Sequence, residues 1–337
     1  MRNGYPLVEL HRHLDGNVRL STVLALAREH RIPLPATTEE ALRPHVQVMS
    51  PEPDLLGFLA KFALLRRVMV DLAACRRIAR ENVEDAAREG IDHIELRFSP
   101  FFMAEEHELD PLAVAEAVCD GVAEGLAHNP QVSAKLIGII SRNYGPDIGW
   151  IELEAAISCR DRGVVALDLA GDEANFPGTL FVDHFRKARE AGLRTIAHAG
   201  EAAGAESVRQ AIEELEVERI GHGIRSVEDE SLLDLIAERG IALEVCPTSN
   251  VQTSTVTSLA DHPLPFFLAR GLRATLSTDD PSISGIDLAH EYRVAAEGLG
   301  LSETELRVLQ ENALEAAFLT EEERAGVGRR RASNREP

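Results

Sequence analysis

The sequence predicts an α/β protein, a closed (β/α)₈ barrel of the TIM type that forms a single domain. Eight short apolar segments recur along the chain, and segments with helical periodicity separate them. The apolar segments are too uniform to leave one face in water, which indicates parallel strands covered by helices. A barrel of this kind commonly occupies a chain of this length, 337 residues, as one domain.

The first predicted strand spans residues 7–10, and the segment that follows it is too long for one crossover helix. The other strands are expected at residues 91–98, 134–140, 164–170, 194–197, 219–222, 241–245 and 273–276. Helices are expected at residues 20–30, 54–70, 75–89, 111–126, 150–161, 181–190, 205–215, 228–239 and 265–270, and again beyond residue 302. An open doubly wound sheet is the alternative. It usually has a glycine-rich phosphate turn after its first strand, where this chain has residues 11–16 (HRHLDG).

The C-terminal region is predicted to end in a helix and a tail. Thr320 and Glu323 have the spacing of a capping box, in which each side chain bonds the backbone N–H of the other residue. The basic residues from 328 onward are expected to be solvated. We therefore expect the domain to span residues 1–325 and residues 326–337 to form a flexible tail.

Composition excludes several classes of partner. The formal net charge of −21 argues against nucleic acid and anionic membranes, because affinity for either depends on lysine and arginine. The four cysteines are scattered without a CxxC pair and are expected to be reduced thiols. The sequence has neither a signal peptide nor a membrane span, so we expect a cytoplasmic protein. We also expect no obligate protein partner.

Histidine and aspartate residues terminate several of the predicted strands. His11 and His13 lie two positions apart and share one face of the first strand, while His198, His222 and Asp279 follow later strands. Each has an ordinary alternative: a solvated histidine pair, a hydrogen-bonded core histidine, or a turn aspartate before a proline. In a barrel, however, the carboxyl ends of all strands open on one rim, so these side chains should converge.

Three imidazoles and a carboxylate are a ligand set that suits catalytic Zn²⁺ with one open position. The predicted ligands are His11, His13, His198 and Asp279. His222 and Glu201 remain beside the metal as a base and an acid, which indicates metal-assisted hydrolysis. The chain has no HExxH, GxSxG, GxxxxGK[ST] or HxE…PCxxC motif, which excludes metalloproteases, serine hydrolases, P-loop enzymes and thiolate-zinc deaminases.

An apolar stripe lies in the long segment after the first strand. Leu55, Phe58, Leu59 and Phe62 share one helical face, which predicts either core packing or an apolar lid over a pocket.

Six segments of the chain resemble the adenosine deaminases, a branch of the amidohydrolase-like metal-dependent barrels, and are most similar to the bacterial enzymes. These segments are residues 9–16 (ELHRHLDG), 168–173 (DLAGDE), 198–201 (HAGE), 219–223 (RIGHG), 246–250 (CPTSN) and 277–281 (STDDP). They occur in the family's order and span nearly the whole chain. The resemblance implies zinc-dependent conversion of adenosine, and of 2′-deoxyadenosine, to inosine and ammonia in purine salvage.

The resemblance also implies a role for each site residue. One Zn²⁺ per chain would be held by His11, His13, His198 and Asp279; His222 would orient and deprotonate the attacking water, and Glu201 would protonate N1 of the purine. Asp279 would also hold the water. Asp280 would bond N7, the N–H of Gly171 would bond N3, and Asp15 would reach the ribose 5′-hydroxyl. Leu55, Phe58, Leu59 and Phe62 would form the family's apolar gate.

Two alternatives to adenosine deamination remain. The first is deamination of free adenine or another 6-aminopurine derivative, and Asp15 distinguishes it because relatives specific for adenine tend to have glutamate there. The second is an inactive barrel that binds a partner, against which the complete ligand set and Glu201 argue.

Overall fold

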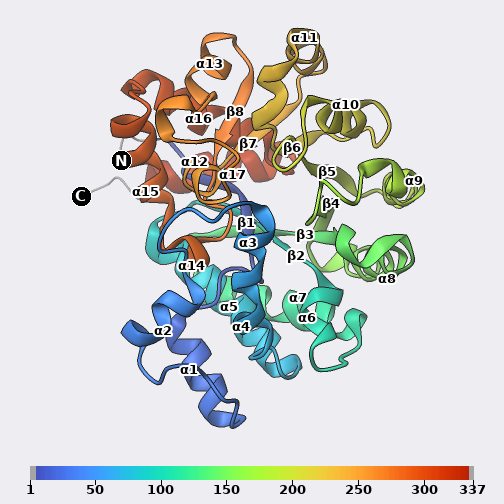
Figure 1. The fold of residues 1–337 in the computed structure, drawn as a ribbon, viewed down its shortest axis with the longest axis vertical. Helices are drawn as coiled ribbons and strands as arrows, with labels where there is room; N and C mark the ends of the chain where they lie inside the picture. Colours follow the sequence, from blue (N-terminus) through green and yellow to red (C-terminus); the bar gives the residue numbers. More distant parts are fainter. Residues whose placement is uncertain (1–4, 334–337) are drawn as a thin grey trace.

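The computed structural model describes residues 5–333 as a barrel of eight parallel strands in sequence order (Figure 1). The strands are β1 (Val8–His13), β2 (His93–Phe98), β3 (Ser133–Ser141), β4 (Val164–Ala170), β5 (Arg194–Ala199), β6 (Arg219–His222), β7 (Ala242–Val245) and β8 (Arg273–Leu276). All eight predicted strands are present with shifts of a few residues at their ends. The predicted (β/α)₈ barrel is therefore confirmed.

The barrel closes between β8 and β1 through a single residue. Asp279, just beyond β8, accepts a hydrogen bond at its carbonyl from the His13 N–H (2.8 Å) and donates its own N–H to the His11 carbonyl (2.9 Å). Its φ of +65° is unusual for a residue with a side chain. Close to this seam, the pairing of β1 with β2 shifts register between Glu9 and Arg12.

Helices cover the outside of the barrel and connect successive strands. They are α1 (Leu20–Glu29), α2 (Glu39–Val46), α3 (Leu55–Leu59), α4 (Ala63–Arg66), α5 (Leu72–Glu89), α6 (Pro100–Glu105), α7 (Pro111–His128), α8 (Gly145–Ser158), α9 (Val182–Glu190), α10 (Ala205–Glu213), α11 (Glu230–Arg239), α12 (Pro247–Gln252), α13 (Leu264–Ala269), α14 (Pro281–Ser284), α15 (Leu288–Arg293), α16 (Glu303–Ala316) and α17 (Glu321–Ser333). No helix within residues 5–333 is long and apolar enough to cross a membrane.

The segment between β1 and β2 differs from its prediction. The single helix expected at residues 54–70 is instead α3, a 3₁₀ turn at Ala60–Phe62 and α4, which ends at Arg66. The prediction of one continuous helix is therefore wrong, because the 3₁₀ turn interrupts the α-helical hydrogen bonds and α4 ends at Arg66. The short helix α2, which has an internal proline, Pro44, was not expected from the sequence.

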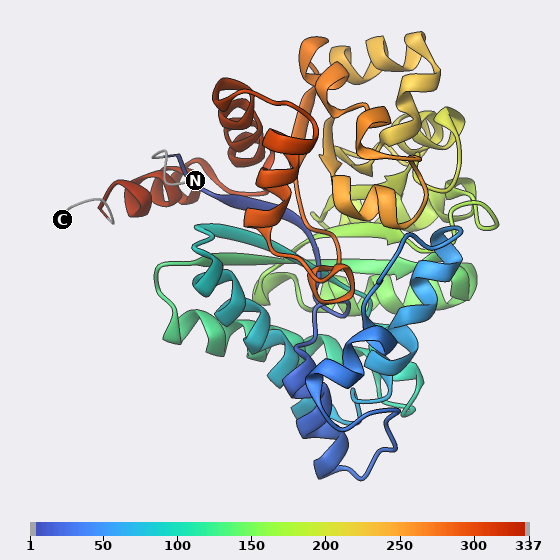
Figure 2. The ribbon, with the colours of Figure 1, turned by 60° about the vertical axis from the view of Figure 1, so that its left-hand side comes forward.

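At the C-terminus, α16 packs against β8 and β1 and is followed by α17. Figure 2 shows α17, in red, on the opposite side of the barrel from the blue segment that contains α3. Thr320 and Glu323 form the predicted capping box: the Thr320 N–H donates to Glu323 Oε2 (2.9 Å), and the Glu323 N–H donates to Thr320 Oγ1 (3.2 Å). The helix continues past the boundary predicted at residue 325, and Val327 is buried against β1. Residues 334–337 of the predicted tail lie outside the described residues.

Candidate metal centre and substrate pocket

The four residues predicted to bind a metal converge at the carboxyl end of the barrel. One ligand atom from each of His11, His13, His198 and Asp279 lies within 4.8 Å of the others. Asp279 Oδ1 lies 3.2 Å from His11 Nε2 and 3.3 Å from His13 Nε2. The Nε2 atoms of His13 and His198 are 3.2 Å apart.

Carboxylates behind two of the histidines fix how their rings face this centre. His11 Nδ1 lies 2.9 Å from Glu244 Oε2, and His198 Nδ1 lies 3.1 Å from Asp168 Oδ2. Each Nδ1–H can therefore donate a hydrogen bond to its carboxylate, so that the lone pair of Nε2 faces the centre. His11 Nε2 is buried without a hydrogen-bond partner, as expected of an atom that is suited to a metal. The donor set of three nitrogens and one oxygen fits zinc.

The supporting carboxylates belong to a buried ionic network inside the barrel. Arg97 contacts both Asp168 (2.7 Å) and Glu244 (2.6 Å), and Arg219 contacts Glu244 (2.7 Å). Burial alone would raise the pKa of Glu244, but the adjacent guanidinium groups of Arg97 and Arg219 hold this pKa below its ordinary value. Both carboxylates stay ionised and keep the histidine rings oriented.

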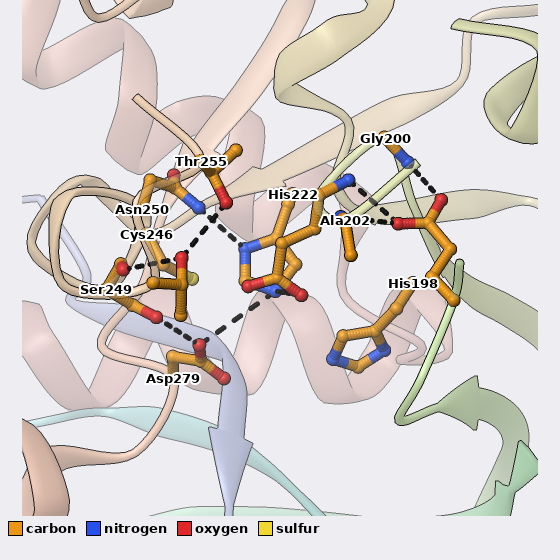
Figure 3. Close-up of polar contacts among 12 residues, drawn as sticks. His198, Gly200, Ala202, His222, Cys246, Ser249, Asn250, Thr255 and Asp279 are labelled. Carbon is orange, nitrogen blue, oxygen red and sulfur yellow. Dashed lines mark hydrogen bonds and ion pairs between the residues drawn. The ribbon is translucent and has the colours of Figure 1, made fainter. Parts of the chain in front are cut away.

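Asp279 uses its two carboxylate oxygens differently. Oδ1 faces His11 and His13, whereas Oδ2 accepts a hydrogen bond from Ser249 Oγ at 2.7 Å. Although burial would raise its pKa, the His11 ring 3.2 Å away and the other nearby imidazoles hold the pKa of Asp279 well below its ordinary value. Figure 3 shows Asp279 and His198 directed toward the same centre.

Glu201 lies beside this centre on a loop that is held by another carboxylate. Glu173 accepts four backbone N–H groups, from Gly200 (2.7 Å), Glu201 (3.1 Å), Ala202 (2.7 Å) and Ala203 (2.9 Å). Burial raises the pKa of Glu201 well above its ordinary value, and the charges of Asp279 and Glu173 raise it further. This environment favours the protonated form of Glu201, which can donate a proton.

A chain of hydrogen bonds sets the tautomer of His222. The Leu264 N–H donates to His262 Nδ1 (3.1 Å), so neutral His262 has its proton on Nε2, which lies 3.3 Å from Asn250 Oδ1. Burial lowers the pKa of His262 to about 4, which keeps it neutral. The Asn250 amide then donates to His222 Nδ1 (3.1 Å), as Figure 3 shows. Because Nδ1 accepts, neutral His222 has its proton on Nε2.

The Nε2 atom of His222 faces both acidic residues of the centre. It lies 3.5 Å from Glu201 Oε2 and 3.9 Å from Asp279 Oδ2. Burial lowers the pKa of His222 well below its ordinary value, so the ring is neutral. In this tautomer Nε2 donates a hydrogen bond, whereas the base role expected from the sequence requires Nε2 to accept one.

A cavity of about 420 Å³ opens above the centre. It is lined by all the residues that were expected to contact substrate: Asp15, Leu55, Phe58, Leu59, Phe62, Gly171 and Asp280. Phe58 and Phe62 are buried, while Leu55 and Leu59 are partly exposed, so the apolar stripe both packs on the core and forms a wall of the cavity.

Two carboxyl groups in the cavity have unused oxygens. Asp15 Oδ2 accepts the Ser99 N–H (3.0 Å), but Asp15 Oδ1 and Asp280 Oδ1 have no hydrogen-bond partner. Burial raises the pKa of Asp15 to about 6. Burial and the charge of Asp279 raise the pKa of Asp280 well above its ordinary value, so Asp280 can donate a proton to a ligand. Gly171 has a φ of +106°, and a Cβ there would lie 2.1 Å from Asn143 Oδ1.

The family model for adenosine deaminase matches residues 6–330 of the chain. The chain belongs to the adenosine deaminase family. An adenosine deaminase from Erwinia tasmaniensis is 56% identical over 97% of this chain and 98% of the relative. The match to the family model covers every residue of the candidate metal centre.

Three solved structures are similar to this adenosine deaminase family member, and two of them have different substrates in their names. An adenine deaminase from Arthrobacter aurescens has a TM-score of 0.85 and 30% identity, and the match covers 98% of both chains. A Burkholderia ambifaria amidohydrolase with bound zinc has a TM-score of 0.85, 26% identity and coverage of 99% of this chain and 91% of the other. The N6-methyl-AMP deaminase of Arabidopsis thaliana has the same TM-score and identity, with coverage of 99% and 98%.

Several supporting residues of this deaminase site were not identified from the sequence. Ser249, Asn250 and Glu173 lie in segments that carry the resemblance, but no role had been assigned to them. Glu244 is the one charged residue of β7, and Arg97 lies in β2, whose six residues are all buried. A charged residue in a buried strand must have a partner, and this signal could have identified both of them.

Proposed function

We propose that this protein deaminates adenosine and 2′-deoxyadenosine by hydrolysis, producing inosine and ammonia, with one Zn²⁺ per chain. The observation that carries the proposal is the buried Glu201, which lies 3.5 Å from His222 Nε2 directly beside the metal centre and has a raised pKa, within a cavity that can hold a nucleoside. Membership of the adenosine deaminase family and the name of the Erwinia tasmaniensis relative support the same substrate.

The residues of the chain divide the chemistry among them. His11, His13, His198 and Asp279 would hold zinc, which when bound acidifies a water molecule so that it can attack at neutral pH. Glu201 would donate its proton to N1 of the purine, which makes C6 more electrophilic. After the water oxygen adds to C6, one water proton would pass to the amino group, which would leave as ammonia. The other water proton would return to Glu201 as the C6 hydroxyl becomes the carbonyl of inosine.

Other side chains would orient the reactants. His222, with its proton on Nε2, would donate a hydrogen bond to the attacking oxygen. Protonated Asp280 would donate to N7, the Gly171 N–H would donate to N3, and Asp15 would accept the 5′-hydroxyl. Leu55, Phe58, Leu59 and Phe62 would exclude water, which strengthens each of these polar contacts.

Deamination of free adenine, or of another 6-aminopurine derivative, is the alternative, because the Arthrobacter aurescens neighbour is an adenine deaminase. The unused Oδ1 of Asp15 favours the nucleoside, since adenine has no group that could reach it. A role in purine salvage, a cytoplasmic location and independence from nucleic acid, membrane and protein partners stay predictions from the sequence.

A steady-state absorbance assay with adenosine, 2′-deoxyadenosine and adenine as parallel substrates tests the proposal. We expect both nucleosides to be converted with a higher kcat/KM than adenine. The Asp15→Ala variant should lose more kcat/KM toward adenosine than toward adenine, since only adenosine uses this carboxyl group. Equal losses, or a wild-type preference for adenine, would show that the alternative is correct.

A further inference from the structure

The outer part of the substrate cavity has one basic side chain, which already forms an ion pair with an acidic side chain. Among the cavity residues, all of which lie in the described part of the chain, Arg66 is the only lysine or arginine. Its Nη1 lies 2.6 Å from Glu105 Oε2. The same oxygen accepts a hydrogen bond from the Tyr144 hydroxyl at 2.7 Å, so Glu105 is held from two sides.

The aromatic residues around this pair keep it in place at the rim. The Arg66 guanidinium lies 5.3 Å from the centre of the Phe102 ring, and Phe101 packs edge-on against Tyr144 with ring centres 4.7 Å apart. Arg66 and Glu105 are partly exposed, with 25% and 41% of their side chains accessible. The pair therefore faces both the solvent and the mouth of the cavity.

The geometry of helix α6 connects this rim to the ribose end of the proposed substrate. Ser99, the N-cap of α6, donates its backbone N–H to Asp15, the residue proposed to bind the 5′-hydroxyl. Phe102, beneath Arg66, lies on the first turn of this helix, and Glu105 is its last residue. At about 1.5 Å per residue, Glu105 is roughly 9 Å along the helix from Ser99. A phosphate on the 5′-oxygen would extend from Asp15 toward this rim.

A phosphate there would meet unfavourable charges. It would carry up to two negative charges and would need to replace a hydroxyl at Asp15, a carboxyl group that has His13 Nδ1 at 3.8 Å but no ion pair with a lysine or arginine among the described residues. Arg66 could neutralise the phosphate only if it broke its ion pair with Glu105, and the negative charge of Glu105 would then remain close to the phosphate. Such like-charge contacts are an effective means of rejecting one ligand in favour of another.

We propose that Glu105 determines specificity by neutralising Arg66, so that the cavity accepts adenosine and excludes 5′-phosphorylated nucleosides. This inference rests on the proposed function, because it assumes that the ribose lies at Asp15. It assigns Glu105 no part in the chemical step. The chemical class that it excludes is the nucleoside 5′-monophosphate, for which adenosine 5′-monophosphate is the probe.

The Glu105→Gln variant tests the proposal because the amide oxygen can still accept from Tyr144 while the negative charge is removed. The readout is the ratio of kcat/KM for adenosine 5′-monophosphate to kcat/KM for adenosine, so that a general loss of activity cancels. We expect this ratio to rise about tenfold, as Arg66 becomes free to pair with the phosphate. The gain should shrink with added salt, since the pair lies near solvent.

Two further variants provide controls. Glu106→Gln removes the same charge from the neighbouring residue, which lies 3.7 Å from Arg66 Nη2, and should change the ratio much less. The Arg66→Ala/Glu105→Gln double variant should lose the gain. An unchanged ratio in Glu105→Gln, an equal rise in Glu106→Gln, or a gain that persists without Arg66 would overturn the proposal. Absence of adenosine turnover in the wild-type enzyme would instead contradict the proposed function.

Discussion

Replacing Glu173 with glutamine should impair both stability and catalysis, although this side chain does not contact the proposed substrate. In the wild-type protein its carboxylate accepts four backbone N–H groups of residues 200–203. A glutamine has only one oxygen, which can take the place of Oε2 and keep three of these bonds. Its amide NH₂ would then face the Gly200 N–H, so that two donors would oppose each other in a buried position.

The expected loss in the free energy of unfolding follows from the strengths of these hydrogen bonds. Bonds to a charged acceptor contribute about 1.5–3 kcal/mol and neutral ones about 0.5–1.5 kcal/mol, so each retained bond should weaken by about 1 kcal/mol. The unpaired Gly200 N–H adds roughly 1–3 kcal/mol. Because adjacent bonds are not additive and the loop can relax, we expect a net loss of about 3 kcal/mol in the free energy of unfolding.

Catalysis should fall because the same N–H groups position Glu201. We expect kcat to decrease by roughly tenfold to a hundredfold through misplacement of the proton donor. The proposed mechanism needs protonated Glu201, so we expect activity to be lost as the pH rises through its raised pKa. Since the charge of Glu173 contributes to that increase, the alkaline loss of activity should begin at a lower pH in Glu173→Gln.

Urea unfolding and the pH dependence of kcat/KM measure these effects. Asp172→Asn is the matched control, because the Asp172 side chain hydrogen-bonds Asn175 and makes none of the four hydrogen bonds to residues 200–203. If Glu173→Gln unfolded like the wild-type protein and retained its kcat and pH profile, Glu173 would not hold the Glu201 loop as described.

Three other substitutions test the assigned roles. Glu201→Gln should reduce kcat by about 10²–10⁴-fold, because it removes the proton donor, while zinc content measured by atomic absorption stays at one ion per chain; a variant without zinc would contradict the role. His13→Ala should lose zinc and turnover together, and a metal-free variant that deaminates adenosine would exclude the proposed centre. Asn250→Asp should shift the His222 proton to Nδ1, since a carboxylate accepts from it. We expect a lower kcat with a similar KM, and a ¹⁵N chemical shift of His222 that stays typical of Nε2–H would contradict the assignment of its tautomer.

The sequence was sufficient for the barrel and for the convergence of the metal-binding residues, because both follow from local patterns. Apolar segments between helices predict parallel strands, and a barrel places His11 and Asp279 on the same rim however far apart they are in the chain. The break between α3 and α4 was not predictable from periodicity, since a 3₁₀ turn retains nearly the same apolar spacing. The tautomer of His222 depends on Leu264 and His262, which meet it only through tertiary packing.

The seam at Asp279 has a consequence for how the protein loses its structure. The first and last strands are joined there by two backbone hydrogen bonds from a residue that also contributes a side chain to the proposed zinc site. A bound ion would thus hold β1 and β8 together where the barrel closes, and the free energy of ion binding would add to the stability of the closed barrel. Removal of the ion by a chelator should make the amide protons of His13 and Asp279 exchange faster than those within the β2–β3 ladder. Equal exchange rates with and without the ion would show that the barrel stays closed between β8 and β1 without a metal.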